Sequence, residues 1–338
     1  MRRRSLLCAL VALLAAAPSG AAKTTPSWAQ AEIKAVVAAG LMASDTASFR
    51  PDDPLTRGAL EQLVAGLTQS TPVTPANPAA TVTMAGLDAR LVNALGLSDT
   101  ARTFTDGARA DGLTVPNRFG NEATARLLGL RTNHPAAQDD LELLPNDAAT
   151  RAETAFSAAK VLHFGGWETQ SVRDAAATFV LPPLTPWQKR ILTTAFRFIG
   201  YPYVWGGTSE HAEAPFGHQA RGGFDCSGFV WRVYKLEAYP NSGGLADTLR
   251  GRTTYAMSGE VPAATRIPFP KLQPADVIFF GNGPKSKPAQ IGHMGIYVGN
   301  GWFVHSSGYG VALAQLTGWY RSSFAWGRRP LAEAGLAT

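Results

Sequence analysis

The sequence predicts two domains: a mostly helical repeat domain, then an α+β domain in which helices pack on an antiparallel sheet. Three observations support this. Apolar residues recur at helical spacing in the first half, and one polar signature occurs twice there. Beyond residue 265, short apolar runs alternate with turn residues, as is typical of strands. A chain of 338 residues is long enough for two or three domains.

The composition is that of an ordinary globular protein, with 45 % hydrophobic and 17 % charged residues. Residues 1–22 have the basic, apolar and small-residue regions of a secretory signal peptide, and the apolar run is too short for an integral membrane anchor. We therefore expect a secreted protein of the cell envelope or cell wall. Without Arg2, Arg3 and Arg4 the formal charge falls from +6 to +3, and no run of basic residues indicates a nucleic-acid partner.

The first helical module is expected at residues 24–70. Apolar residues at helical spacing run from Trp28 to Leu41, and a turn rich in proline and aspartate follows. Thr56 is placed to cap a second helix, whose apolar face continues to Leu67.

An internal repeat is indicated by the signature Pro-x-Asp-x-x-Thr-Arg, which stands at residues 51–57 and again at residues 145–151. The second copy predicts a divergent module over residues 95–165. A further copy is at best weakly visible at residues 119–126.

Two linkers separate these modules from one another and from the second domain. Residues 71–94 begin with a stretch rich in Thr, Pro, Ser and Asn, and residues 166–186 end in several prolines. The second domain is expected at residues 187–330. Its predicted strands are 277–280, 294–298, 302–305 and 324–327.

The repeated segments resemble S-layer homology modules, helical units that attach envelope proteins to wall polymers. Arg57 and Arg151 match the motif arginine of that family. The resemblance implies that they bind an anionic secondary wall polymer, since a guanidinium fork suits carboxyl or phosphate groups. The first copy departs from the family pattern, reading Thr-Arg-Gly in place of Thr-Arg-Ala-Glu. The alternative interpretation is that each Thr-Arg pair only caps and starts a helix.

Cys226 is the one cysteine outside the expected signal peptide, because Cys8 lies within it. Small and polar residues precede Cys226, and apolar residues follow it at helical spacing, which places it in the first turn of a helix. Unpaired N–H groups and the helix dipole favour a thiolate there. We therefore expect a reactive thiol.

His293 and His305 are expected on two neighbouring strands joined by residues 299–301. If these three residues form the loop, Gly295 pairs with His305 and the two histidines are diagonal neighbours on one face. A two-residue turn would put them on opposite faces. The three-residue loop is therefore predicted, with Gly292 and Gly295 leaving room for a substrate beside His293.

The second domain resembles the NlpC-type, papain-like family of bacterial cell-wall cysteine peptidases. The matching segments are residues 203–207 (Tyr-Val-Trp-Gly-Gly), 225–230 (Asp-Cys-Ser-Gly-Phe-Val), 292–299 (Gly-His-Met-Gly-Ile-Tyr-Val-Gly) and 304–307 (Val-His-Ser-Ser). The resemblance implies a papain-like α+β fold.

The same resemblance implies a role for each site residue. Cys226 is the expected nucleophile, His293 the base and general acid, and His305 the third member that orients His293. Tyr203 is expected near the thiol and the oxyanion. Two further residues, Asp225 and Ser227, are expected to contact the peptide substrate, although either could equally cap the helix.

The family cleaves amide bonds in peptidoglycan stem peptides, typically between D-glutamate and the following diamino acid, and needs no cofactor. The same core also hosts amidases and acyl transferases, and a non-catalytic wall-binding protein is a further alternative. His211 and His218 lie in an unusually long loop, but no cysteine or carboxylate cluster completes a metal site with them, so none is expected.

Overall fold

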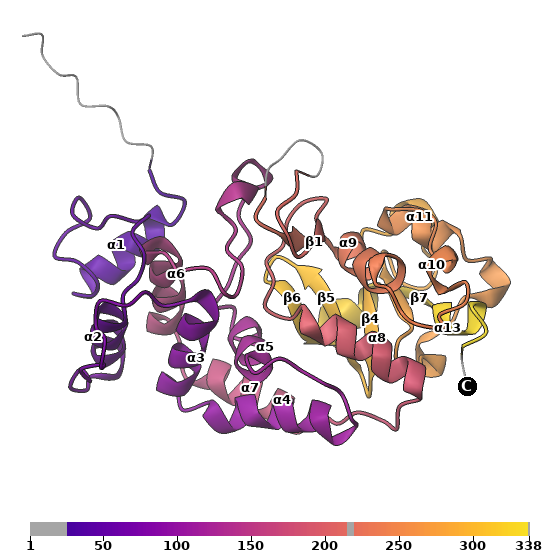
Figure 1. Ribbon diagram of the computed structural model, residues 1–338, viewed down its shortest axis with the longest axis horizontal. Helices are drawn as coiled ribbons and strands as arrows, with labels where there is room; N and C mark the ends of the chain where they lie inside the picture. Colours follow the sequence, from indigo (N-terminus) through magenta and orange to yellow (C-terminus); the bar gives the residue numbers. More distant parts are fainter. Residues whose placement is uncertain (1–25, 215–219, 337–338) are drawn as a thin grey trace, which may run out of the picture.

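The computed structural model describes residues 26–214 and 220–336, so the predicted signal peptide lies outside the described residues. A helical N-terminal half stands beside a C-terminal half built on an antiparallel sheet (Figure 1). The predicted fold class is confirmed. No helix in the described part of the chain is long and apolar enough to cross a bilayer.

The helical half contains seven α-helices and one 3₁₀ turn within the described residues. They are α1 (Gln30–Ala38), α2 (Arg57–Thr68), α3 (Met84–Ala94), α4 (Ser98–Ala110), α5 (Phe119–Leu127), η1 (Ala136–Leu141), α6 (Arg151–Leu162) and α7 (Trp167–Ala177). Thr56 caps α2 as predicted, because its side chain accepts a hydrogen bond from the N–H of Ala59.

Three helices of this half, α2, α3 and α6, start from one three-way junction. The N–H of Leu55 donates to the carbonyl of Ala149, Ala149 donates to Val82, and Val82 donates back to Leu55, over 2.7–2.9 Å. In each strand-like segment the next residue is the threonine that caps the helix: Thr56, Thr83 and Thr150. The three segments thus bond to one another in a closed cycle.

The third copy of the motif is therefore the segment that leads into α3. The prediction of a weak motif copy at residues 119–126 is wrong, since those residues form α5 and not a segment of the junction. The segment before α3 lacks the arginine of the signature, and Met84 stands at the position of Arg57 and Arg151. The segment before α3 thus keeps the backbone pairing of the repeat although it has lost the arginine of the motif.

Both predicted linkers contain helices and are corrected accordingly. In residues 71–94, α3 buries Met84, Leu87, Leu91 and Val92. In residues 166–186, α7 buries Val172 and Ala176. In each case apolar residues at helical spacing outweigh the nearby prolines.

The sheet of the C-terminal half has five antiparallel strands in the order β6-β5-β4-β3-β7. They are β3 (Val277–Phe280), β4 (His293–Gly299), β5 (Trp302–Ser307), β6 (Gly310–Gln315) and β7 (Phe324–Arg328). Four strands are where the sequence predicts them, whereas β6 was not predicted. A separate two-stranded ladder joins β1 (Thr208–Ser209) to β2 (Gly223–Phe224).

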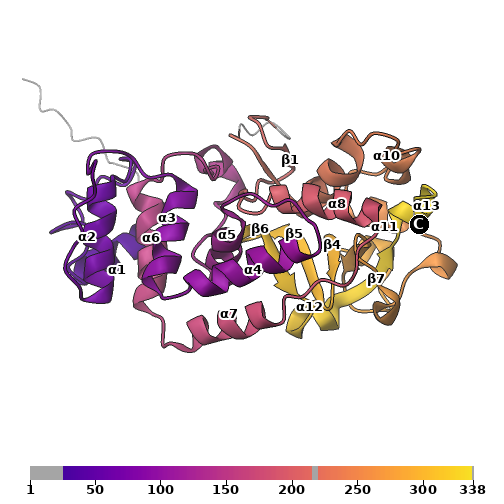
Figure 2. The same cartoon turned by 60° about the horizontal axis from the view of Figure 1, so that its bottom comes forward.

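Each face of the sheet is covered. Residues such as Phe279 and Ile296 share the main core with α8 (Pro186–Arg197) and α9 (Cys226–Trp231). On the other face, Phe280 and Phe303 belong to a smaller core beneath α12 (Gly318–Ser323). Figure 2 shows α8 and α12 on opposite sides of the sheet. The remaining helical segments are η3 (Arg232–Leu236), α10 (Leu245–Thr248), α11 (Thr254–Gly259), η4 (Ala263–Thr265), η5 (Phe269–Lys271), η6 (Pro288–Gln290) and α13 (Pro330–Glu333).

The two halves share one hydrophobic core. Trp302 of β5 packs against Phe104 of α4 and Phe179, with ring centroids 5.8 Å and 5.4 Å apart. Phe119 of α5 stacks on Phe196 of α8 at 5.0 Å. The helical half is thus packed directly against the domain that carries the cysteine and histidines.

Candidate active site

Cys226 is the first residue of α9, as the sequence predicts, and its thiol is free and half-buried. Asp225 caps the helix by accepting the N–H of Gly228 on its carboxylate. A side chain at Gly228 is excluded, because a Cβ there would lie 1.8 Å from the carbonyl oxygen of Gly207. The absence of a side chain at Gly228 therefore lets the first turn of α9 pack directly on the backbone of Gly207, in the segment that carries Tyr203.

Asp225 and Ser227 hold the start of this helix and do not line the pocket beside the thiol. Ser227 donates to Asp225 over 2.9 Å, and Arg252 donates to Ser227 over 2.7 Å and to Asp225 over 3.3 Å. Their predicted contact with a peptide finds no support in this geometry. Arg252 was not predicted, since it lies in a stretch with few regular patterns.

His293 and His305 meet, with His293 Nε2 and His305 Nδ1 2.7 Å apart. The predicted three-residue loop is wrong, because Gly299 pairs with Trp302 and the turn is Asn300-Gly301. Both turn residues have positive φ, 48° and 81°, which is the type I′ geometry favoured by Asn-Gly.

A bulge restores the register that this turn would otherwise lose. The pairing of β4 with β5 shifts between Tyr297 and Gly299, and Ile296 then pairs with Val304. One extra residue on β4 returns His293 and His305 to the same face. The histidines therefore become diagonal neighbours by a route that the sequence analysis did not consider.

Both histidines are neutral at physiological pH. Burial lowers the pKa of His293 to about 4, and burial together with His293 lowers the pKa of His305 well below its usual value. The rings of Phe280 and Tyr320 lie 5.6 Å and 6.3 Å from that of His293 and supply no charge. For His293 Nδ1 to accept a proton, Nε2 must carry the hydrogen that bonds to His305 Nδ1.

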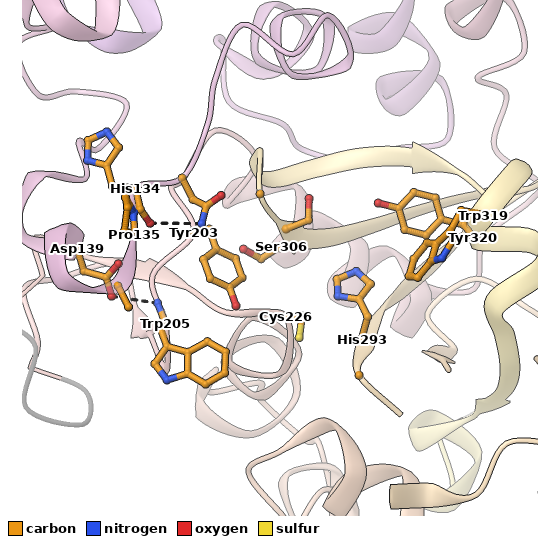
Figure 3. A pocket seen from close by; sticks show the side chains of 15 residues that line it. His134, Pro135, Asp139, Tyr203, Trp205, Cys226, His293, Ser306, Trp319 and Tyr320 are labelled. Atoms are coloured by element: carbon orange, nitrogen blue, oxygen red, sulfur yellow. Dashed lines mark hydrogen bonds between the residues drawn. The ribbon is translucent and has the colours of Figure 1, made fainter. Parts of the chain in front are cut away.

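The surroundings of Cys226 favour the protonated thiol. Burial raises its pKa to about 12, and the Asp225 carboxylate acts in the same direction. Backbone N–H groups of Met294 and Ser227 oppose this shift without reversing it. Burial therefore opposes the thiolate that the start of a helix was expected to favour. Figure 3 shows His293 beside the sulfur.

Tyr203 points its hydroxyl toward Cys226 from the opposite side to His293 (Figure 3). Burial raises its pKa, with Cys226 and Asp225 adding to the shift, so the phenol keeps its proton. A protonated phenol and the backbone N–H of Cys226, the first residue of α9, are suitable donors for an oxyanion.

These groups open into a pocket of about 570 Å³, within the range of small-ligand sites. Gly292 lines it and has open space where a side chain would be, as expected, whereas Gly295 packs under Phe303 and His305. One wall of the pocket comes from the helical half and was not predicted from the sequence. Its residues are Asn133, His134, Pro135, Ala136 and Asp139.

The two predicted wall-polymer arginines differ in their surroundings. Arg57 is exposed. Arg151 donates to the carbonyls of Phe49 and Met42, over 2.7 Å each, and lies over the ring of Phe49. Its guanidinium is thus used to hold the first module's loop.

His211, the described member of the histidine pair in the long loop, is exposed, and His218 lies outside the described residues. Within the part of the chain that the structure describes, no group of three or more His, Cys, Asp or Glu side chains could hold a metal ion.

Comparison with known proteins gives two family matches: residues 200–329 match the NlpC/P60 family and residues 21–60 the S-layer homology domain. The "probable peptidoglycan endopeptidase LytE" of Bacillus subtilis is 34% identical over 131 residues, 39% of this chain and 30% of that protein. The "gamma-D-glutamyl-L-lysine dipeptidyl-peptidase" of the same organism is 29% identical over 127 residues, 38% and 34% of the two chains.

The chain thus spans about a third of the length of these relatives. Among solved structures, an NlpC/P60 family protein from Bacillus cereus is 27% identical, with a TM-score of 0.30, over 44% of this chain and 41% of that one. By their matches to the family models, residues 200–329 form an NlpC/P60 family domain and residues 21–60 carry an S-layer homology domain.

Proposed function

We propose that the protein is a secreted peptidoglycan peptidase that hydrolyses an amide bond of stem peptides, the one between D-glutamate and the following diamino acid. The observation that carries the proposal is the 2.7 Å contact between His293 and His305 in a site that also holds Cys226 and Tyr203. The names of both curated relatives support a peptidase of this class, and one of them specifies a γ-D-glutamyl bond.

Acylation begins from the thiol and the neutral imidazole. As Cys226 Sγ attacks the amide carbonyl carbon, its proton passes to His293 Nδ1. The resulting imidazolium donates through Nε2 to His305 Nδ1, which fixes the ring and spreads its charge. The negative charge on the carbonyl oxygen is met by the Cys226 N–H and the Tyr203 hydroxyl.

The intermediate then collapses. His293 returns its proton to the leaving nitrogen, the carbon–nitrogen bond breaks, and an amine departs from the thioester. Water attacks the thioester and gives a proton to His293 as its oxygen bonds to carbon. The carbon–sulfur bond then breaks as His293 returns the proton to Cys226 Sγ, which releases the carboxyl product and restores the thiol and neutral His293.

The helical half would hold the enzyme at the wall. Its S-layer homology match and the exposed Arg57 support attachment to an anionic secondary wall polymer. Attachment would raise the local concentration of stem peptides and confine the cleavage to the envelope.

The test is digestion of purified peptidoglycan and of soluble muropeptides by the mature protein beside the Cys226→Ala variant, with products identified by mass spectrometry. Fragments cut after D-glutamate by the wild type alone are the expected result. Products in which the acyl group is joined to a new amine would instead indicate an acyl transferase. Sedimentation with wall material but no Cys226-dependent product would indicate a non-catalytic wall-binding protein.

A further inference from the structure

An exposed tryptophan stands at the edge of the pocket beside His293. Trp319 is the second residue of α12 and lines the pocket, yet it is 61 % exposed. An indole is a large apolar group, and leaving it in water forgoes the free energy that its burial would supply. No step of the proposed mechanism uses Trp319. Its exposed surface is therefore available to a ligand in the pocket.

Neighbouring rings hold this indole in place. It stacks on Phe280 of β3, with ring centroids 6.4 Å apart and an interplanar angle of 25°, and Tyr320 meets it edge-on at 5.2 Å. Phe280, which is buried, also stacks on His293 at 5.6 Å and 29°. Because Trp319 and His293 pack on the same phenyl ring, the indole has a defined position relative to the base.

The position of Trp319 indicates which part of a substrate it meets. In Figure 3, Trp319 and Tyr320 lie with His293 on one side of Cys226, and Tyr203 lies on the other. His293 must give its proton to the leaving nitrogen, so the leaving part of the substrate extends along the side of His293. Trp319 is therefore placed beside the residue that departs with that nitrogen.

This side of the pocket is aromatic and carries no full charge in the described part of the chain. Among the described residues that line the pocket, Asp139 is the one Asp, Glu, Lys or Arg, and it lies on the side of Tyr203. Burial raises the pKa of Tyr320 to about 12, so its phenol keeps its proton. Such a surface gains free energy from contact with methylene groups but offers no ion pair to an ammonium or a carboxylate.

We propose that Trp319 is a specificity-determining residue that packs against the methylene chain of the leaving diamino acid. The inference rests on the proposed peptidase function. Lysine and diaminopimelate share such a chain and differ by a carboxylate at its end. Because the contact is with the chain, the site should accept both and discriminate against a short leaving residue such as alanine.

The test uses peptides that differ only in the leaving residue, L-alanyl-γ-D-glutamyl-X with X as lysine, diaminopimelate, norleucine or alanine. Norleucine keeps a methylene chain but lacks the charge of lysine. Cleavage is measured for the wild type and for Trp319→Ala, Trp319→Phe and Trp167→Ala, each checked by thermal unfolding. Trp167 is the matched control, since it is 70 % exposed on α7 and does not line this pocket.

Binding is measured separately from turnover. Each peptide is titrated calorimetrically into the Cys226→Ala protein, with and without Trp319→Ala. The second substitution should weaken binding of the lysine peptide roughly tenfold and leave binding of the alanine peptide within about twofold.

For the wild type, kcat/KM should agree within about threefold on the lysine, diaminopimelate and norleucine peptides and be roughly tenfold or more lower on the alanine peptide. Trp319→Ala should lower kcat/KM roughly tenfold on the three long residues and by less than about twofold on alanine. Trp319→Phe should lose less, because it keeps an aromatic face, and Trp167→Ala should change every rate by less than about twofold.

Equal wild-type rates on the lysine and alanine peptides would overturn the proposal. So would a Trp319→Ala loss of the same size on every peptide, which would mean that Trp319 only positions His293 through Phe280. A norleucine peptide cleaved far more slowly than the lysine peptide would assign recognition to the ammonium group and also overturn it.

The peptidase assignment can fail on its own. Trp319-dependent binding of the lysine peptide by the Cys226→Ala protein, without turnover by the wild type, would support the contact and reject that assignment. Absence of both binding and turnover would overturn the two together.

Discussion

Two histidines on opposite sides of the pocket, His134 and the half-buried His293, have pKa values shifted in opposite directions. His293 lies among aromatic rings and against neutral His305, and burial lowers its pKa to about 4. Burial acts on His134 in the same direction, but its contacts with Glu153 and Glu142 outweigh it and raise the pKa. The charge of the neighbours thus decides whether the pKa of a shielded histidine falls, as for His293, or rises, as for His134.

The largest effect is expected for His293→Ala, which removes the base from the neutral side of this comparison. The value of kcat should fall roughly 10³- to 10⁴-fold, since the other proton acceptors lining the pocket, His134 and Asp139, lie on the far side of Cys226 from His293. Steady-state kinetics on free stem peptides measure this. Thermal unfolding serves as the control and should show that the variant remains folded at the assay temperature. A fall of less than about tenfold would argue against His293 as the base.

Arg131→Met tests the cluster of buried charges beside His134. The variant leaves Asp88 buried without its salt-bridge partner and leaves Glu153 with His134 alone, and should lower the free energy of unfolding by about 3–5 kcal/mol. Denaturant titration gives the value. The exposed Arg102, whose pair with Asp99 lies on the surface, provides the control, and Arg102→Met should change stability by about 0.5 kcal/mol or less. A similar result for both variants would mean that the cluster contributes little.

The pH dependence of stability should differ in sign between the two sites. Because the pKa of His134 is raised, its contribution is present below the unfolded value near 6.5 and is lost as pH rises through the folded pKa. Glu142, whose pKa burial raises to about 8, acts in the same direction. His293, with a lowered pKa, destabilises the fold as pH falls from 6.5 toward 4.

Unfolding measured at about pH 5.5 and about pH 8.5 separates these contributions. His134→Gln should cost more stability at the lower pH. His293→Gln should relieve acid destabilisation and have little effect at the higher pH. On the activity side, kcat/KM should fall on an acidic limb with its midpoint near pH 4, where His293 becomes protonated. A limb near pH 6.5 would mean that His293 is not shielded as described.

The smallest effect is expected for the two arginines of the repeated signature. Arg151 is bonded to the protein, whereas Arg57 is exposed. Arg151→Met removes two hydrogen bonds to backbone carbonyls and should lower the unfolding free energy by roughly 1–2 kcal/mol. Arg57→Met should change it by less than about 0.5 kcal/mol. Wall sedimentation of the same pair tests polymer binding: a loss for Arg57→Met alone is expected, and equal retention would remove Arg57 from that role.

Local patterns in the sequence were sufficient for much of this protein. The capping of α2 by Thr56, the start of α9 at Cys226 and four of the five sheet strands depend on residues within a few positions of one another, so spacing and turn chemistry predict them. The same is true of the fold class and of the family to which the second domain belongs.

Other features depended on segments far apart in the chain. The bulge between Tyr297 and Gly299 sets the register of the histidines, and the three-way junction identifies the third motif copy by backbone pairing alone. The protonation states of Cys226 and His293 follow from what the folded chain places around them. The pocket wall comes from a loop more than sixty residues before Tyr203 along the chain. Only the tertiary structure determines these features, because they depend on burial and on packing between distant segments. Neither produces a periodic pattern in the sequence.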